Sequence, residues 1–220
     1  MDRAFRRYFS QADLDRITSA VKEAEAKTSG EIIPYFVLRS DSYHETAWRA
    51  GALGGATILL IALVVILFLD VWMPVSLPEV CIIALGVGAL AFLLTHLVPT
   101  FQRMLAGKET MAHRVHQRAQ QAFLSEEVFK TRERTGILLF LSLFERRVVV
   151  MGDAGINANV EQSHWDGIVR MVVEGMKRGQ PADGLVTAID RCGELLAKHG
   201  VKRRRDDTDE LSDNLRMSKQ

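Results

Sequence analysis

The chain has 220 residues, 28 Lys and Arg against 27 Asp and Glu, and an apolar content of 48%. That length suits one or two domains with an ample core, and the balanced charge gives no overall argument for nucleic acid as a partner. The two cysteines, Cys81 and Cys192, form no pattern, so they indicate unpaired thiols in a reducing compartment and not a disulfide framework. Residues 1–20 carry charges throughout, which argues against a signal peptide.

Residues 1–49 predict one helix and one strand. Ser10 is a candidate N-cap, and Asp13 stands in the first turn, where a carboxylate stabilises the helix. Residues 31–38 are rich in β-branched and aromatic side chains, and Pro34 among them indicates an edge position or a bulge. Because a sheet needs about three strands or other packing partners to be stable, this half of the chain must fold with a later part.

Two long runs in the middle of the chain carry no formal charge, residues 50–69 and residues 80–102. A helix needs about 20 mainly apolar residues to cross the roughly 30 Å of a bilayer core. Trp48 and Trp72 stand at the two ends of the first run, where amphipathic rings favour the membrane interface. The sequence therefore predicts a transmembrane helical hairpin over residues 50–102, with spans at 50–70 and 79–101.

Small residues in these two runs indicate close helix packing. Gly51 and Gly55 form a GxxxG pair in the first run, and Gly86 and Gly88 lie in the second. Such residues let two helices approach closely, so they predict packing within the hairpin and leave a homodimer through the hairpin open as an alternative. Neither run contains Asp, Glu, Lys or Arg, and a transport pathway normally needs buried polar groups. A transporter is therefore not expected.

The distribution of Lys and Arg predicts the orientation of the hairpin. Residues 70–79 between the two runs contain two acids and no Lys or Arg. Basic residues lie outside the hairpin instead, at Arg39, Arg49, Arg103, Lys108, Arg114 and Arg118. Since Lys and Arg near span ends favour the cytoplasm, we expect a protein of the inner cell membrane with both termini cytoplasmic. Residues 1–49 and 103–220 can then meet on one side of the bilayer.

The second half supplies the missing partners for the first strand. The expected elements are a helix over residues 108–133, strands over 137–143 and 148–151, a helix capped by Asn159 that ends at Gly179, and a helix from Pro181 to Gly200. Residues 201–220 are polar and mixed in charge, which predicts a disordered tail. About three strands and several helices, shared between residues 1–49 and 103–200, predict one layered α/β domain.

Two separated stretches of this sequence resemble the TPM-domain family. They are residues 24–32 (AEAKTSGEI) and residues 135–156 (TGILLFLSLFERRVVVMGDAGI), and Trp165 and residues 184–189 fit the same pattern. The resemblance implies a three-layer α/β/α sandwich with a small central sheet, here interrupted by the two-helix hairpin. Some members of the family have acid phosphatase activity, some bind calcium, and plant members assist photosystem II repair.

The loop after the second strand of this domain is the candidate site. Asp153 and Asn157 offer the oxygen ligands that calcium or magnesium prefers, and Glu161 or Asp166 could add a carboxylate from the next helix. The predicted metal set is Asp153, Asn157 and Asp166. The alternative, which we favour, is a turn in which Asp153 accepts hydrogen bonds from nearby backbone N–H groups.

No established phosphatase motif is present. Cys192 has Lys198 and not arginine six positions later, so the cysteine-phosphatase loop is missing, and the place of Cys192 in an apolar stripe indicates packing. The sequence has no GxxxxGK loop, and Ser142 lies within a strand. Metal-assisted hydrolysis at Asp153 is therefore the one route to phosphatase chemistry. His113 and His116 lie on a helix flanked by arginines, which favours contact with anionic headgroups over metal binding.

The sequence thus favours a membrane-anchored, non-catalytic binding or accessory module for the assembly or maintenance of another membrane protein. Its predicted partners are the lipid bilayer and a second membrane protein, and nucleic acid is not expected. A metal-dependent, acid-phosphatase-like hydrolase centred on Asp153 is the first alternative. A domain that responds to divalent cations without catalysis is the second.

Overall fold

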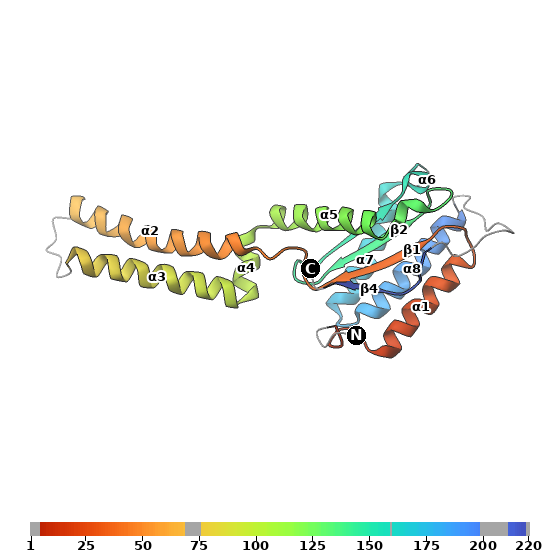
Figure 1. The fold of residues 1–220 in the computed structure, drawn as a ribbon, viewed down its shortest axis with the longest axis horizontal. Coiled ribbons are helices and arrows are strands. Elements are labelled where there is room, and N and C mark those ends of the chain that lie inside the picture. Colours follow the sequence, from red (N-terminus) through yellow and green to blue (C-terminus); the bar gives the residue numbers. More distant parts are fainter. Residues whose placement is uncertain (1–4, 69–75, 159, 199–210, 219–220) are drawn as a thin grey trace. The chain divides into compact units, whose positions relative to one another are not determined.

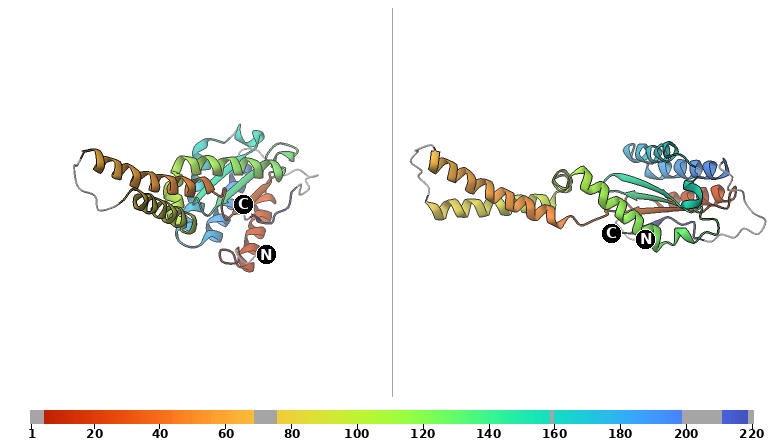
Figure 2. Two further views of the ribbon diagram at one scale, coloured as in Figure 1. Left: turned by 60° about the vertical axis from the view of Figure 1, so that its left-hand side comes forward. Right: turned by 90° about the horizontal axis from the view of Figure 1, so that it is seen from above.

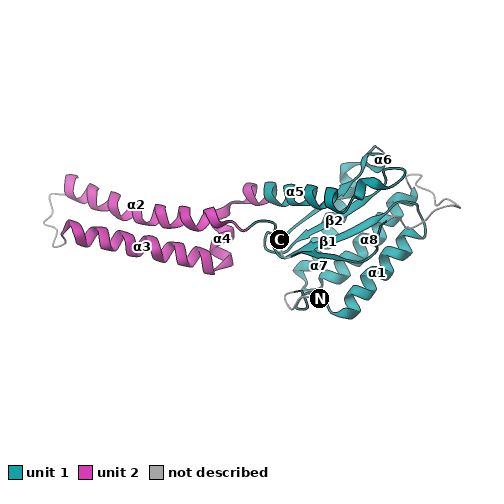
Figure 3. Cartoon of the chain, viewed as in Figure 1, with its two compact units in different colours: residues 1–41, 112–220 teal, residues 42–111 magenta. Residues whose placement is uncertain are grey.

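The computed structural model describes residues 5–68, 76–158, 160–198 and 211–218, whose helices and strands are labelled in Figure 1. The chain divides into two compact units, one of residues 1–41 and 112–220 and one of residues 42–111 (Figure 3). The first unit thus combines two stretches that are separated in the sequence by the whole of the second. The second unit includes more residues at both ends than the hairpin expected over residues 50–102.

The first unit is built on a four-stranded sheet with the order β3-β2-β1-β4 (Figure 1). Its strands are β1 (Ile32–Val37), β2 (Ile137–Ser142), β3 (Arg147–Gly152) and β4 (Arg216–Ser218). β1 runs parallel to β2 and to β4, whereas β2 and β3 form an antiparallel hairpin. The register pairs Ile32 with Ile137 and Val37 with Ser142, so the strand before the hairpin and the strand after it are direct neighbours.

Helices cover both faces of this sheet, and the expected three-layer α/β/α architecture is confirmed. Alternate residues of β1 and β2 face α1 (Gln11–Glu25), α7 (Gln162–Lys177) and α8 (Pro181–Lys198) on one side. The other residues face α5 (Lys108–Ser125) and the 3₁₀ turn η1 (Val128–Lys130). Figure 2 (right) shows α7 and α8 on one side of the strands and α5 on the other.

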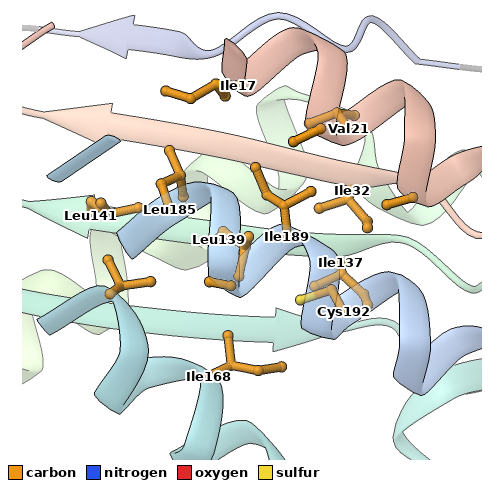
Figure 4. Close-up of a cluster of buried hydrophobic side chains, with 14 of the residues drawn as sticks. Ile17, Val21, Ile32, Ile137, Leu139, Leu141, Ile168, Leu185, Ile189 and Cys192 are labelled. Atoms are coloured by element: carbon orange, nitrogen blue, oxygen red, sulfur yellow. The ribbon is translucent and has the colours of Figure 1, made fainter. Parts of the chain in front are cut away.

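The larger core lies between the sheet and the first group of helices (Figure 4). It includes Ile17, Val21, Ile32, Ile137, Leu139, Leu141, Ile168, Leu185, Ile189 and Cys192, of which none is more than 1% exposed. β2 is buried along its whole length, as is usual for a strand covered on both faces. This explains why its sequence is an unbroken apolar run.

The start of α1 agrees with the sequence prediction. The Ser10 hydroxyl accepts from the backbone N–H of Asp13, and the Asp13 carboxylate accepts from the backbone N–H of Ser10. These bonds from Ser10, with Arg16 nearby, lower the pKa of Asp13 below its ordinary value of 3.8. A reciprocal cap of this kind satisfies two of the donors that a helix start leaves unpaired.

Several boundaries in the second half differ from the predictions. The helix expected over residues 108–133 ends at Ser125, and Glu127 takes a left-handed φ of 56° before η1. Asn159, the expected cap, lies outside the described residues, and α7 begins after Glu161. The loop after β3 contains one helical turn, α6 (Ala154–Asn157).

The expectation of a disordered tail over residues 201–220 is wrong for its last part, because β4 pairs with β1 from Tyr35 to Val37. Leu215 is buried, and Arg216 forms an ion pair with Glu126 at 3.0 Å. β4 also explains Pro34. The backbone N–H of Leu38 donates to Ser218 of β4, so the backbone N–H groups of the even-numbered residues of β1 are directed towards β4. The pairing with β4 begins at Tyr35, one position after Pro34. The missing N–H of Pro34 therefore leaves no gap in the ladder.

The second unit contains α2 (His44–Phe68), α3 (Leu77–Leu97) and α4 (Pro99–Ala106). α2 and α3 are long and apolar enough to cross a membrane. The two helices pack closely at their glycines: a Cβ on Gly88 would lie only 2.9 Å from the carbonyl oxygen of Gly51. The second long helix ends at Leu97 and not at 101, since proline disfavours a helical conformation in the preceding residue. Trp72 and most of the loop between the helices lie outside the described residues.

Candidate functional site

Asp153 is placed at the end of β3 as the N-cap of α6. Its Oδ1 accepts from the backbone N–H of Ala154 at 2.7 Å and from the Nη2 of Arg134 at 3.1 Å. Its Oδ2 lies 2.6 Å from the Nε of Arg134, and the Asp153 side chain is 6% exposed. The carboxylate is therefore engaged by one backbone donor and one guanidinium.

The loop that carries Arg134 is held against this turn by backbone contacts. Arg134 takes a left-handed φ of 58°, and its carbonyl accepts from the backbone N–H of Gly155 at 2.9 Å. A Cβ on Gly155 would lie 2.3 Å from the carbonyl oxygen of Glu133, so only glycine allows this approach. The backbone N–H of Asp153 donates to Gly136 at 2.8 Å. Asp153 and Arg134 are thus brought together by main-chain contacts on both sides.

The other predicted ligands lie in separate local interactions. The Asn157 side chain donates to the carbonyl of Gly152 at 2.5 Å. Asp166 is exposed and accepts from Gln162, one turn earlier on α7, at 3.1 Å. Within the described ranges, no three or more His, Cys, Asp or Glu residues form a group that could hold a metal ion. The set Asp153, Asn157 and Asp166 stays a prediction.

Cys192 packs in the core, as its apolar stripe predicted. Cys192 lies on α8 and is fully buried in the core beside the sheet, and this burial raises the pKa of its thiol. A thiol in this environment is a poor nucleophile, because the thiolate is the reactive form. His113 and His116 are both exposed on α5.

A buried polar cluster lies at the opposite edge of the sheet, where the parallel strands β1 and β2 end. Glu145, 6% exposed, accepts from the backbone N–H of Ser40 at 2.9 Å and from the hydroxyl of Ser142. The hydroxyl of Ser40 donates to that of Ser142 at 2.8 Å. Sequence reasoning missed this cluster, because a glutamate in a charged turn between two strands gives no sign of burial. The cluster fixes the segment that leads from β1 into the second unit.

A groove opens beside this cluster at the same edge of the sheet. One cavity of about 430 Å³ is lined by Leu143, Arg146, Val173, Met176 and Lys177. A second, of about 190 Å³, shares Leu143 and Met176 and is also lined by Arg7, Tyr8, Phe36, Gly179 and Pro181. Together these residues form what we call the basic groove. Its floor is apolar, and its three cations, Arg7, Arg146 and Lys177, are exposed. In open α/β sheets, ligands bind outside the carboxyl ends of parallel strands.

Comparison with known proteins agrees with the resemblance seen in the sequence. Residues 95–195 match the family model described as the TPM domain. The NMR structure of the BA42 protein from the psychrophilic bacterium Bizionia argentinensis is similar, with a TM-score of 0.57, 19% sequence identity and 96% of each chain covered. At that identity the likeness concerns the fold alone. No curated protein matches the chain in sequence.

Proposed function

Because residues 95–195 match the TPM-domain model, we propose that the chain acts as a membrane-anchored, non-catalytic binding or accessory module for another membrane protein. The observation that carries this proposal is the way in which the hairpin interrupts the sheet. β1 ends at Val37 before the hairpin, and its parallel neighbour β2 begins at Ile137 after it. The domain is therefore tethered to the hairpin at two points and cannot form its sheet without both flanking segments.

The surface of the hairpin supports a membrane anchor. Large apolar side chains stay exposed along both long helices, among them Leu60 at 61%, Ile66 at 59%, Ile82 at 68% and Leu85 at 75%. Isolated soluble proteins rarely expose such continuous apolar surface. Lipid acyl chains would cover it.

The basic groove is the surface that we assign to the partner. Its apolar floor at Leu143 and Met176 would bury an apolar side chain, and the cations around it favour an acidic neighbour. We therefore expect the partner to present an acidic segment with an apolar anchor, from the cytoplasmic side of a membrane protein.

Photo-crosslinking in intact cells tests this assignment. A photoreactive residue at position 143 is expected to capture one integral membrane protein, identified by mass spectrometry. Reversing the charge at the groove (Arg146→Glu with Lys177→Glu) should remove the crosslink. Arg170→Glu, an exposed position on α7 that does not line the groove, should leave it unchanged. Capture of no membrane protein, or equal loss in the Arg170 control, would count against the proposal.

The proposed orientation has a separate test. A cysteine introduced into the loop of residues 71–78 is expected to react with an impermeant thiol reagent in intact cells. One introduced at Ser212 is expected to stay unmodified until the membrane is permeabilised. The reverse pattern would overturn the cytoplasmic placement of the domain.

The two alternatives that centre on Asp153 rest on a buried carboxylate at a sheet edge in a family whose members include phosphatases and calcium binders. A cation at Asp153 would compete with the guanidinium of Arg134, which lies 2.6 Å from its Oδ2. Calorimetric titration with calcium and magnesium, and a panel of phosphomonoesters, test these alternatives. Binding or hydrolysis that is lost in Asp153→Ala would favour them over the accessory role.

A further inference from the structure

The short helix α4 begins immediately after the second long helix. α3 ends at Leu97, Val98 takes an extended conformation with φ −107° and ψ 105°, and Pro99 starts α4. The chain therefore turns at this point instead of continuing the span. Three residues at helical spacing then form an exposed apolar face, which we call the α4 face: Phe101 at 44% exposure, Met104 at 68% and Leu105 at 49%.

Gln102 fixes the direction of the α4 face. Gln102 is 4% exposed. Its Nε2 donates to the carbonyl oxygens of Ser42 at 3.0 Å and Tyr43 at 3.3 Å, just before α2 begins. Successive residues of a helix point about 100° apart. Since Gln102 is held against the start of α2, Met104, which lies about 160° from it around the helix, points away from that contact, whereas Phe101 and Leu105 lie about 100° and about 60° from Gln102. The α4 face thus lies beside the buried Gln102 on the helix surface, and its three side chains stay exposed.

The surroundings of α4 within the second unit are typical of a membrane interface. Aromatic rings lie close together where α2 begins and α3 ends. The distance between ring centroids is 4.9 Å for Trp48 and Phe92, 5.8 Å for Phe92 and His96, and 6.3 Å for His96 and His44. Amphipathic rings favour the headgroup region. The basic residues of this end of the unit are Arg49, Arg103 and Lys108.

We propose that α4 is an interfacial helix. Its apolar α4 face inserts at the headgroup–acyl boundary of the leaflet in which α3 ends, and Arg49, Arg103 and Lys108 lie near anionic phospholipid headgroups. This inference rests on the proposed membrane anchorage. A lipid surface is the occupant that fits, because α4 follows the apolar helix α3 after a single residue and its own apolar face stays exposed. Cations near an anionic surface are attracted to it.

Spin labelling of the full chain in phosphatidylcholine–phosphatidylglycerol vesicles tests the inference. Cys81→Ala removes the exposed native thiol, and Cys192 is buried and stays unlabelled. A label at Met104 is expected to collide more with oxygen than with a nickel chelate, as a label at Leu94 in α3 should. A label at Thr110, exposed beyond α4, should favour the nickel chelate.

The possible outcomes separate this inference from the proposed anchorage. If the label at 104 resembles the label at 110 while the label at 94 is shielded, the anchor stands and the interfacial helix is wrong. If the label at 94 is itself open to the nickel chelate, the anchorage fails as well. Dipolar broadening at 104 that grows with protein density would assign the face to a second copy and overturn the lipid assignment. Unchanged depth at 104 in vesicles without phosphatidylglycerol would overturn the headgroup contact.

Discussion

Replacing Asp153 with alanine is the change that best separates a structural carboxylate from a functional one. The variant loses an N-cap acceptor, which typically costs about 1 kcal/mol. It also loses an ion pair with a guanidinium that is 54% exposed, which contributes up to about 1 kcal/mol. We therefore expect Asp153→Ala to lower the free energy of unfolding by about 2 kcal/mol. For a domain of this size that corresponds to a fall in Tm of about 4–8 °C.

Trp165 provides a local signal for this measurement, because its ring approaches a Cβ built on Gly152 to 3.2 Å, next to the site. Urea unfolding of the full chain in detergent would be followed by its fluorescence, with Trp48 and Trp72 replaced by phenylalanine. Asp153→Asn keeps an oxygen acceptor and should cost about half as much. Asp166→Ala is the matched control, and as an exposed substitution it should stay within about 0.5 kcal/mol of the parent.

The opposite result would refute this reasoning. If Asp153→Ala is as stable as the parent without added metal, the cap and the ion pair contribute nothing. If millimolar calcium then stabilises the parent and not the variant, the carboxylate is a ligand, since a ligand that binds only the folded state raises its stability. Our expectation is that calcium leaves the urea midpoint of the parent unchanged.

Three further predictions concern packing and charge. Gly88→Ala should weaken the packing of the two hairpin helices by about 1–3 kcal/mol, because the new Cβ would meet a backbone oxygen at 2.9 Å. Gly86→Ala is the control and should not weaken this packing, because nothing lies within 4 Å of its new Cβ. Helix separation in SDS, followed with a fluorophore pair, compares the two variants. Leu139→Ala should lower the free energy of unfolding by about 2–5 kcal/mol in urea titration, whereas Leu124→Ala, at a side chain 63% exposed, should change it little. Asp13→Asn should cost about 0.3–1 kcal/mol at pH 7. Because the folded state lowers the pKa of Asp13, the stability it adds is present above its ordinary value of 3.8 and is lost as the pH falls below it, so parent and variant should converge in acid.

The architecture of the domain was predictable to the extent that it depends on periodic signals. Residues 137–143 predicted the strand β2, and the capping signal of Ser10 and Asp13 predicted the start of α1. The interrupted domain followed from a physical argument, since one helix and one strand cannot complete a core. β4 escaped prediction because three residues of mixed polarity carry no periodic signal, and their strand conformation depends on the open side of β1.

The candidate sites show the same division. The turn around Asp153 was predictable in kind, because a short acidic side chain after a strand commonly caps a local backbone donor. Its partner Arg134 was not, since nothing local relates two charges across the β2–β3 hairpin. The basic groove combines residues from the N-terminal segment, the β2–β3 turn and α7, so it exists only once the layers are assembled.

The sequence by itself therefore determined most of the elements: two apolar helices of membrane length, the strands β1, β2 and β3, and the main helices that cover the sheet. These follow from the composition and spacing of neighbouring residues, which act over a few positions of the chain. Only the tertiary structure decided which distant groups meet: β4 on β1, Arg134 on Asp153, and Gln102 on the residues before α2. Such contacts depend on distances of about 3 Å between atoms far apart in the sequence, and those distances are set by packing and not by local preference.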